Sequence, residues 1–150
     1  MGNAVLQVHE GPLRDFYEPI QLGPCTQGGL ELLVHTIRMH FELFPAHIAI
    51  KLDIKNMFNE IKRALSILKL EQIAELRTMV PFLWAVLSPE SPVFYPDGTP
   101  ANFASAEGGR QGAPEAGHVA CVPLQEILKR AHDMVNTHDG FVRADFDDAY

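Results

Sequence analysis

Apolar residues recur at two different periods along this chain of 150 residues. Between residues 30 and 44 they follow helical spacing, which predicts an amphipathic helix. From His47 to Asp53, apolar and polar positions alternate, which predicts a strand with one buried face. Ile48, Ile50 and Leu52 lie on that face, so the strand would leave Asp53 on the other face at its exit.

The later part of the chain continues this alternation of helical and extended patterns. The pattern predicts a helix after Asn56 and a third helix from about Glu71 to Val86. A hairpin that turns at Asp97-Gly98 follows. The last predicted elements are a helix from Pro114 that bends at Pro123, and a strand after Gly140. This order indicates one α+β domain, in which helices pack on one face of a mainly antiparallel sheet.

Acidic residues stand at the ends of two of the predicted strands. Asp53 ends the first, and the pair Asp147-Asp148 follows the last. If these strands are neighbours, the carboxylates converge, and carboxylate oxygens are the ligands that Mg²⁺ prefers. The sequence therefore predicts a magnesium site suited to phosphoryl transfer.

Three blocks of sequence resemble the reverse transcriptases of non-LTR retrotransposons. Lys51–Asn59 is similar to motif A of that family, Glu107–Pro114 to its Gln-Gly loop, motif B, and Phe146–Asp148 to its acidic pair, motif C. The blocks occur in the family's order. The resemblance implies an RNA-directed DNA polymerase with a palm-like sheet, in which residues 1–45 form the end of the fingers and the entry to the palm, and residues 46–150 form the palm.

The resemblance also implies a truncated polymerase, with incomplete fingers, no thumb and no return strand after the acidic pair. A palm without these parts does not clamp a primer and template, so we expect weak or no activity from this chain alone. The implied partners are an RNA template, a DNA primer and deoxynucleoside triphosphates.

Catalytic roles follow from the matched positions. The resemblance implies that Asp53 and Asp147 ligate two Mg²⁺ or Mn²⁺ ions, and that Asp148 supports them. Ions held in this way activate the primer 3′-hydroxyl and neutralise the leaving pyrophosphate.

Substrate-binding roles are implied for five more residues. The backbone carbonyl of Ile54 would complete the metal shell, and the ring of Phe58 would lie under the incoming sugar and disfavour a 2′-hydroxyl. Gln111 and Gly112 would lie against the incoming nucleotide, and Arg110 would reach a phosphate or face solvent. A role for Phe58 in the core is equally open.

Charge opposes part of this interpretation. The net charge of −7 is unusual for a protein that grips nucleic acid. The local exception is a basic set, which is either a phosphate-binding group or a solvated helix face: Lys51, Lys55, Lys62, Arg63 and Lys69. With no long apolar run and no secretory signal pattern, we expect an intracellular protein without a membrane partner, nuclear or cytoplasmic, and of open oligomeric state.

Two other functions remain open. Asp145 and Ala113 depart from the family pattern, and Asp145 adds like-charge repulsion beside the acidic pair, which favours a non-catalytic remnant of a retroelement. Asp145-Phe146-Asp147 also matches the Asp-x-Asp pattern of metal-dependent glycosyltransferases, although that function leaves Asp53 unexplained.

Overall fold

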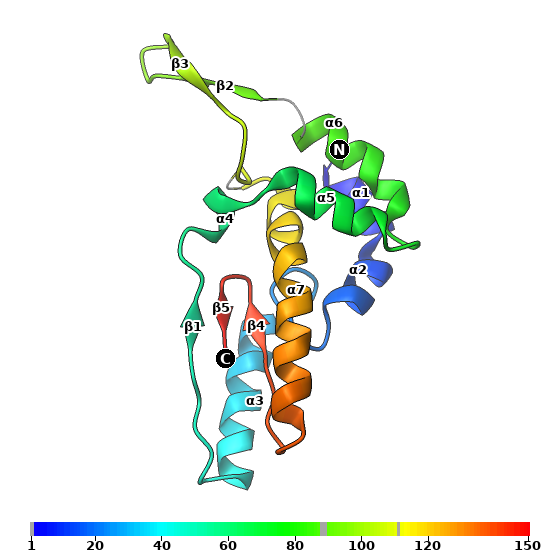
Figure 1. Cartoon of the computed structure of the whole chain (residues 1–150), viewed down its shortest axis with the longest axis vertical. Coiled ribbons are helices and arrows are strands. Elements are labelled where there is room, and N and C mark those ends of the chain that lie inside the picture. Colours follow the sequence, from blue (N-terminus) through cyan, green and yellow to red (C-terminus); the bar gives the residue numbers. More distant parts are fainter. Residues whose placement is uncertain (1, 88–89, 111) are drawn as a thin grey trace.

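The computed structural model describes residues 2–87, 90–110 and 112–150. Figure 1 shows an elongated molecule, with most of the short helices at one end and a small sheet between two long helices at the other. The helices are α1 (Gly2–Val8), α2 (Glu10–Tyr17), α3 (Gly29–Leu43), α4 (Met57–Glu60), α5 (Arg63–Glu71), η1 (Arg77–Met79), α6 (Val80–Leu87) and α7 (Pro114–Asn136). The strands are β1 (Leu52–Asp53), β2 (Ser91–Phe94), β3 (Pro100–Ser105), β4 (Ala144–Asp145) and β5 (Asp148–Ala149).

The strands form two separate antiparallel sheets. One has three strands in the order β1-β5-β4, and the other is the hairpin of β2 and β3. A single parallel bridge joins Gln21 to Ala144 at the outer edge of β4. The predicted α+β class and the antiparallel pairing are therefore confirmed.

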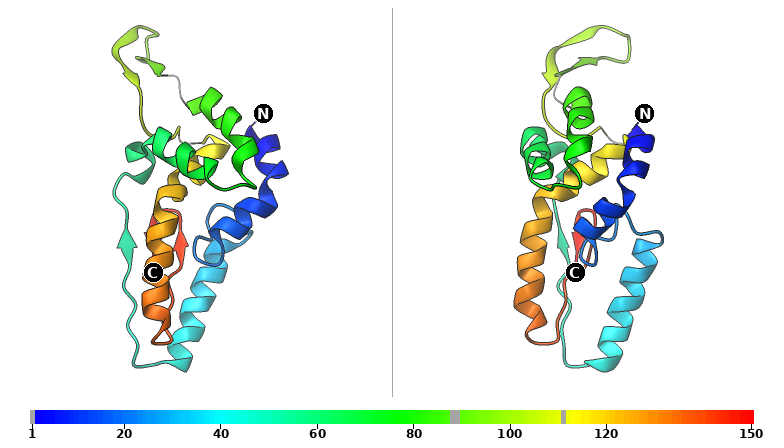
Figure 2. Two further views of the ribbon diagram at one scale, coloured as in Figure 1. Left: turned by 45° about the vertical axis from the view of Figure 1, so that its right-hand side comes forward. Right: turned by 90° about the vertical axis from the view of Figure 1, so that its right-hand side faces the viewer.

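The predicted layering is wrong. Figure 2 shows α7 and α3 on opposite sides of β1 and β5, so helices do not share one face of the sheet. The buried residues of the sheet, Ala144 and Ala149, cluster with Leu128 of α7 on one side. On the other side, α3 lies next to β4.

Both outer strands are shorter than the alternating pattern predicts. β1 contains only Leu52 and Asp53, and Ile48 and Ile50 are 82% and 63% exposed instead of buried. The cause is the absence of a pairing partner, since residues 48–51 make no backbone hydrogen bond to other described residues. The return strand expected to be missing begins as β5, which pairs with both β4 and β1.

The helix boundaries also differ from the pattern. Two helices that the pattern did not predict, α1 (Gly2–Val8) and α2 (Glu10–Tyr17), precede α3, and the helix predicted from Glu71 begins only at η1. Asn56 precedes α4 in a left-handed conformation, with φ of 55°, and its side chain makes no capping bond. Pro123 does lie inside α7, and Figure 2 shows the bend in that helix.

The main core lies at the helical end, where α2, α5, α6 and α7 meet. Its buried residues include Leu13, Tyr17, Ile67, Leu83 and Val122. The apolar stripe of α3 is mostly exposed, because only Leu33 of its large apolar residues is buried. No helix among the described residues has the length and apolar character needed to span a bilayer.

Arg63 connects this core to the glycine-rich loop after β3. Its buried guanidinium donates to the carbonyl of Gly108 at 2.6 Å and to the carbonyl of Glu107 at 2.9 Å. It also donates to Ser105, at both the carbonyl and the hydroxyl, and to the carbonyl of Leu87. One side chain thus donates to four residues, including Glu107 and Gly108 at the start of the loop, where it holds the backbone in place.

We predict that Arg63→Met lowers the free energy of unfolding by about 3 kcal/mol, because several buried acceptors lose their donor. Urea unfolding followed by the fluorescence of Trp84 measures this. Arg130→Met is the matched control, since Arg130 is exposed and its one ion pair among the described residues is with Glu126, and it should change stability by less than about 1 kcal/mol. Equal losses in the two variants would contradict the role of Arg63.

Candidate functional site

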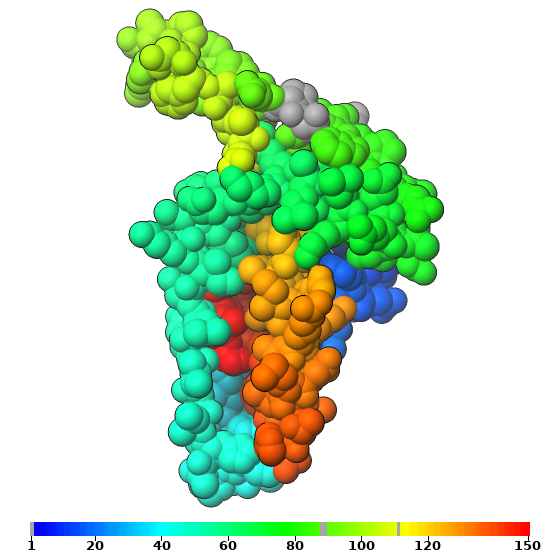
Figure 3. Space-filling view, viewed as in Figure 1, coloured from blue at the N-terminus to red at the C-terminus, as the bar shows by residue number. Residues whose placement is uncertain are grey.

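The predicted acidic residues meet at the end of the three-stranded sheet. Asp53 is the register partner of Asp148 across β1 and β5, and Asp148 is the register partner of Asp145 across β5 and β4. The amide of Ile54 donates to the carbonyl of Asp147 at 3.0 Å, which ties the end of β1 to the hairpin turn. Figure 3 shows β5 at the bottom of a furrow between the β1 segment and α7.

Asp145 binds its proton more tightly than a free aspartate does. Partial burial, with Asp148 and Asp147 nearby, raises the pKa of Asp145 above its ordinary value. Lys51 offsets part of this charge, since its Nζ lies 2.9 Å from Oδ2 of Asp148. The hydrogen bond to Asp148 in turn raises the pKa of Lys51.

The donor set consists of hard carboxylate oxygens, which suit Mg²⁺ or Mn²⁺. Within the described residues, however, no three His, Cys, Asp or Glu side chains are placed to hold a metal ion together. Asp148 is instead paired with Lys51. The residues fit a magnesium site in their chemistry and in their shared sheet edge, and side-chain rearrangement would have to complete it.

Gln21 holds the turn that carries the acidic pair. Its side-chain amide accepts from the backbone N–H of Phe146 at 2.8 Å and donates to the carbonyl of Phe146 at 3.0 Å. The backbone beside Gln21 also pairs with β4, since Leu22 donates to the carbonyl of Ala144 at 2.8 Å. Gln21 is fully buried, and the sequence analysis gave it no role.

Two glycines make room for the ring of Phe146. A Cβ at Gly23 would lie 2.6 Å from this ring, and a Cβ at Gly117 would lie 2.7 Å from it. Phe146 itself has a positive φ of 56°, a conformation that costs a residue with a side chain. The bonds to Gln21 compensate for this cost.

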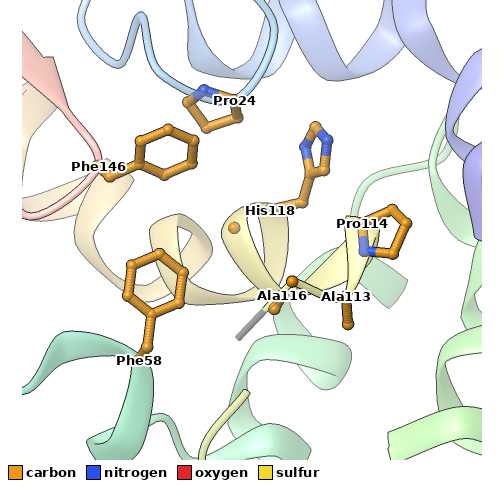
Figure 4. Close-up of a pocket in the computed structure, with 9 residues that line it drawn as sticks. Pro24, Phe58, Ala113, Pro114, Ala116, His118 and Phe146 are labelled. Carbon is orange, nitrogen blue, oxygen red and sulfur yellow. The ribbon is translucent and has the colours of Figure 1, made fainter. Parts of the chain in front are cut away.

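The three blocks of sequence meet around one pocket of about 230 Å³. Figure 4 shows Phe58 and Phe146 on one side of it, and Pro24, His118 and the start of α7 around the rest. The ring centroids of Phe58 and Phe146 are 6.2 Å apart. Phe58 thus lines the pocket and also packs against the main core, so both predicted roles of this residue are compatible.

The Gln-Gly loop contributes the pocket wall at Gly112 and Pro114. It packs closely on α4, because Gly109 donates to the carbonyl of Phe58 at 2.6 Å, and a Cβ at Gly108 would lie 2.8 Å from the carbonyl oxygen of Asn59. Gln111 lies outside the described residues.

Two other residues that the sequence predicts to bind substrate form hydrogen bonds within the protein instead. Arg110 donates to the hydroxyl of Ser91 in the β2–β3 hairpin. The carbonyl of Ile54, predicted to complete a metal shell, accepts from the N–H of Met57 at 3.2 Å.

Four of the five residues in the predicted basic set have partners within the protein, and Lys55 is exposed without an ion pair among the described residues. Arg63 is buried, and Lys62 and Lys69 pair with Glu107 and Glu126. Lys51 pairs with Asp148. The sequence pattern identified the positive charges but not the acceptors that tertiary packing brings to them.

One residue that lines the pocket, His118, lies next to a cysteine. Nδ1 of His118 lies 4.0 Å from Sγ of Cys25. Burial lowers the pKa of His118 to about 4, so its imidazole is neutral at ordinary pH. Burial raises the pKa of Cys25 to about 11, so its thiol stays protonated and is a poor nucleophile.

No protein-family model matches this sequence, and the chain matches neither a curated protein nor a solved structure.

We predict that Gln21→Met lowers the free energy of unfolding by about 2 kcal/mol, because two backbone groups of Phe146 lose their partner. Chemical denaturation measures the change. The control is Gln7→Met in α1, an exposed position where the effect should stay below about 0.5 kcal/mol. A Gln21→Met variant as stable as the control would show that the turn holds without this side chain.

We predict that Asp145→Asn makes the protein more stable near neutral pH. The folded state binds the Asp145 proton more tightly than the unfolded state, so the parent loses stability relative to the variant as pH rises through the raised pKa. Below the ordinary value of 3.8 the advantage of the variant should disappear. Unfolding midpoints measured from about pH 3 to pH 7 test this.

Asp97→Asn is the control, and we expect it to change stability near neutral pH in the opposite direction. Hydrogen bonds from Thr99 lower the pKa of Asp97, so its contribution to stability is present above 3.8 and is lost as pH falls through the lowered pKa. This variant should therefore be less stable than the parent near neutral pH. The same sign in both variants would contradict the assignment.

Proposed function

We propose that this chain is the palm part of an RNA-directed DNA polymerase, acting by two-metal nucleotidyl transfer onto a primer 3′-hydroxyl. One observation carries the proposal. Asp53, from the first block of sequence, is in register with Asp148, from the last, and the pocket beside them is lined by residues of all three blocks. Residues 53 and 148 are far apart in sequence, so their pairing does not follow from local pattern.

In this proposal, the carboxylates bind the divalent cations. Asp53 and Asp147 are the main ligands, and Asp148 supports them from the adjacent position in β5. When bound, two Mg²⁺ or Mn²⁺ ions supply activation of the attacking hydroxyl and charge neutralisation on the leaving pyrophosphate. The chain itself fixes where these ligands stand, through β-pairing and through Gln21.

In this proposal, Lys51 takes the place of a cation when none is bound. Its ammonium neutralises Asp148 when the carboxylates lack cations, and it must leave Oδ2 of Asp148 when a cation binds there. Lys51 is exposed, and its ammonium also lies 5.7 Å from the centroid of the Tyr150 ring. The Lys51 side chain can therefore move away from Asp148 without the loss of a buried contact.

The pocket beside the carboxylates receives the incoming deoxynucleoside triphosphate. Phe58 and Phe146 supply aromatic surface, and Gly112 allows close approach of the backbone. The described residues offer few free positive charges for a template, so the proposed RNA template and DNA primer need further basic surface, such as the fingers and thumb of a longer polymerase.

A second candidate function is a non-catalytic remnant of a retroelement. The ion pair between Lys51 and Asp148 favours it, because it occupies a carboxylate oxygen that a cation would need. The two candidates differ in whether the acidic residues bind a divalent cation with measurable affinity.

We predict saturable binding of Mn²⁺ and Mg²⁺, measured by calorimetry on this chain. Asp53→Asn and Asp147→Asn should each weaken binding by about tenfold or more, because each removes a charged ligand. Asp133→Asn is the matched control, since Asp133 lies on α7 outside the acidic group. This variant should bind Mn²⁺ and Mg²⁺ with the same affinity as the parent protein.

Unsaturable binding, or equal affinity in all variants, would favour the remnant. Primer extension on an RNA template, with this chain fused to fingers and thumb segments of a known reverse transcriptase, tests the reaction itself. Extension that persists unchanged in Asp147→Asn would refute the polymerase proposal.

A further inference from the structure

The hairpin of β2 and β3 stands apart from the rest of the molecule. Figure 3 shows it as an arm that projects from the body, and both views of Figure 2 agree. Among the described residues it is a two-stranded sheet of its own, tied to the body at its base by Arg63 and Arg110. We call residues 91–105 the arm. An isolated two-stranded hairpin is only marginally stable in water, so a further strand would stabilise it.

The arm exposes aromatic rings and carries almost no charge. Phe94 and Phe103 are each 59% exposed, and Tyr95 is 51% exposed. The only charged residue in the arm is Asp97, which lies in the turn. The net charge of −7 makes two copies of the chain repel each other, so an uncharged, projecting arm is the part through which two copies can approach most closely.

The two outer edges of the arm differ in their ability to pair with another strand. Pro92 of β2 stands opposite Ala104 and carries no backbone N–H, so it interrupts any ladder on the outer edge of β2. In β3 the one proline, Pro100, occupies the first position, and the rest of the strand keeps its N–H groups. No charged side chain protects this edge, and among the described residues β3 pairs only with β2. The open edge of the arm is therefore the edge of β3.

We propose that β3 pairs with β3 of a second copy of this chain, so that the two arms form one four-stranded antiparallel sheet. Two antiparallel copies of the same strand edge complement each other about a two-fold axis, so one open edge supplies both halves of the contact. An axis beside Phe103 places its ring opposite the same ring of the second copy, and the two exposed rings cover each other. Because Pro92 interrupts both outer edges of the new sheet, assembly stops at the dimer. This surface is independent of the proposed polymerase function.

The test is sedimentation equilibrium of the full chain from micromolar to millimolar concentration. We expect a reversible equilibrium between monomer and dimer. Hydrogen exchange on the same samples should show the amides of β3 exchanging more slowly as the concentration rises, because the second copy gives them partners. A monomer at every concentration, species that grow beyond the dimer, or a dimer without added protection of β3 would overturn the proposal.

Two variants locate the contact. Phe103→Lys should weaken the dimer by about tenfold or more, because it removes the aromatic pair and places two like charges opposite each other. Phe94→Lys is the matched control, since Phe94 is equally exposed but lies on β2, away from the paired edge. This variant should dimerise as the parent does. Equal losses in the two variants would show only a general association of exposed rings and would reject the β3 contact.

Discussion

The hydrogen bonds between Gln21 and Phe146 are the constraint on which the acidic end of the molecule depends. One side chain satisfies both backbone groups of a turn residue whose own conformation is unfavourable. The turn sets the register of β4 and β5, and that register places Asp145 and Asp148 opposite each other. β1 then adds Asp53 to the same group. A contact between residues 125 positions apart thus determines where the carboxylates stand.

This arrangement concentrates like charges, which opposes folding unless something neutralises them. Burial, together with the neighbouring Asp148 and Asp147, raises the pKa of Asp145, and the ion pair of Lys51 with Asp148 relieves part of the repulsion. Such tension is common where a protein is built to bind a cation, because the bound ion supplies the missing charge. Both the electrostatics and the β-pairing therefore support the proposed cation site at this end of the sheet.

α7 connects the different parts of the molecule. Its first turns border the pocket that is lined by Phe58 and Phe146, and its middle turns cover the buried alanines of the sheet. The bend at Pro123 lies between these regions. One helix therefore connects the pocket to the sheet that carries the acidic residues.

The sequence by itself determined the α+β class, the helix after residue 29, the hairpin at Asp97-Gly98 and the two acidic strand ends, because these follow from local periodicity and turn chemistry. It did not determine the exposure of Ile48 and Ile50, the partners of Arg63 and Lys51, or the role of Gln21. These depend on which distant segments pack together, and periodicity shows that a face is apolar without showing what covers it. Only the tertiary structure decided that Asp53 and Asp148 are partners, because β-register is fixed by contacts remote in sequence.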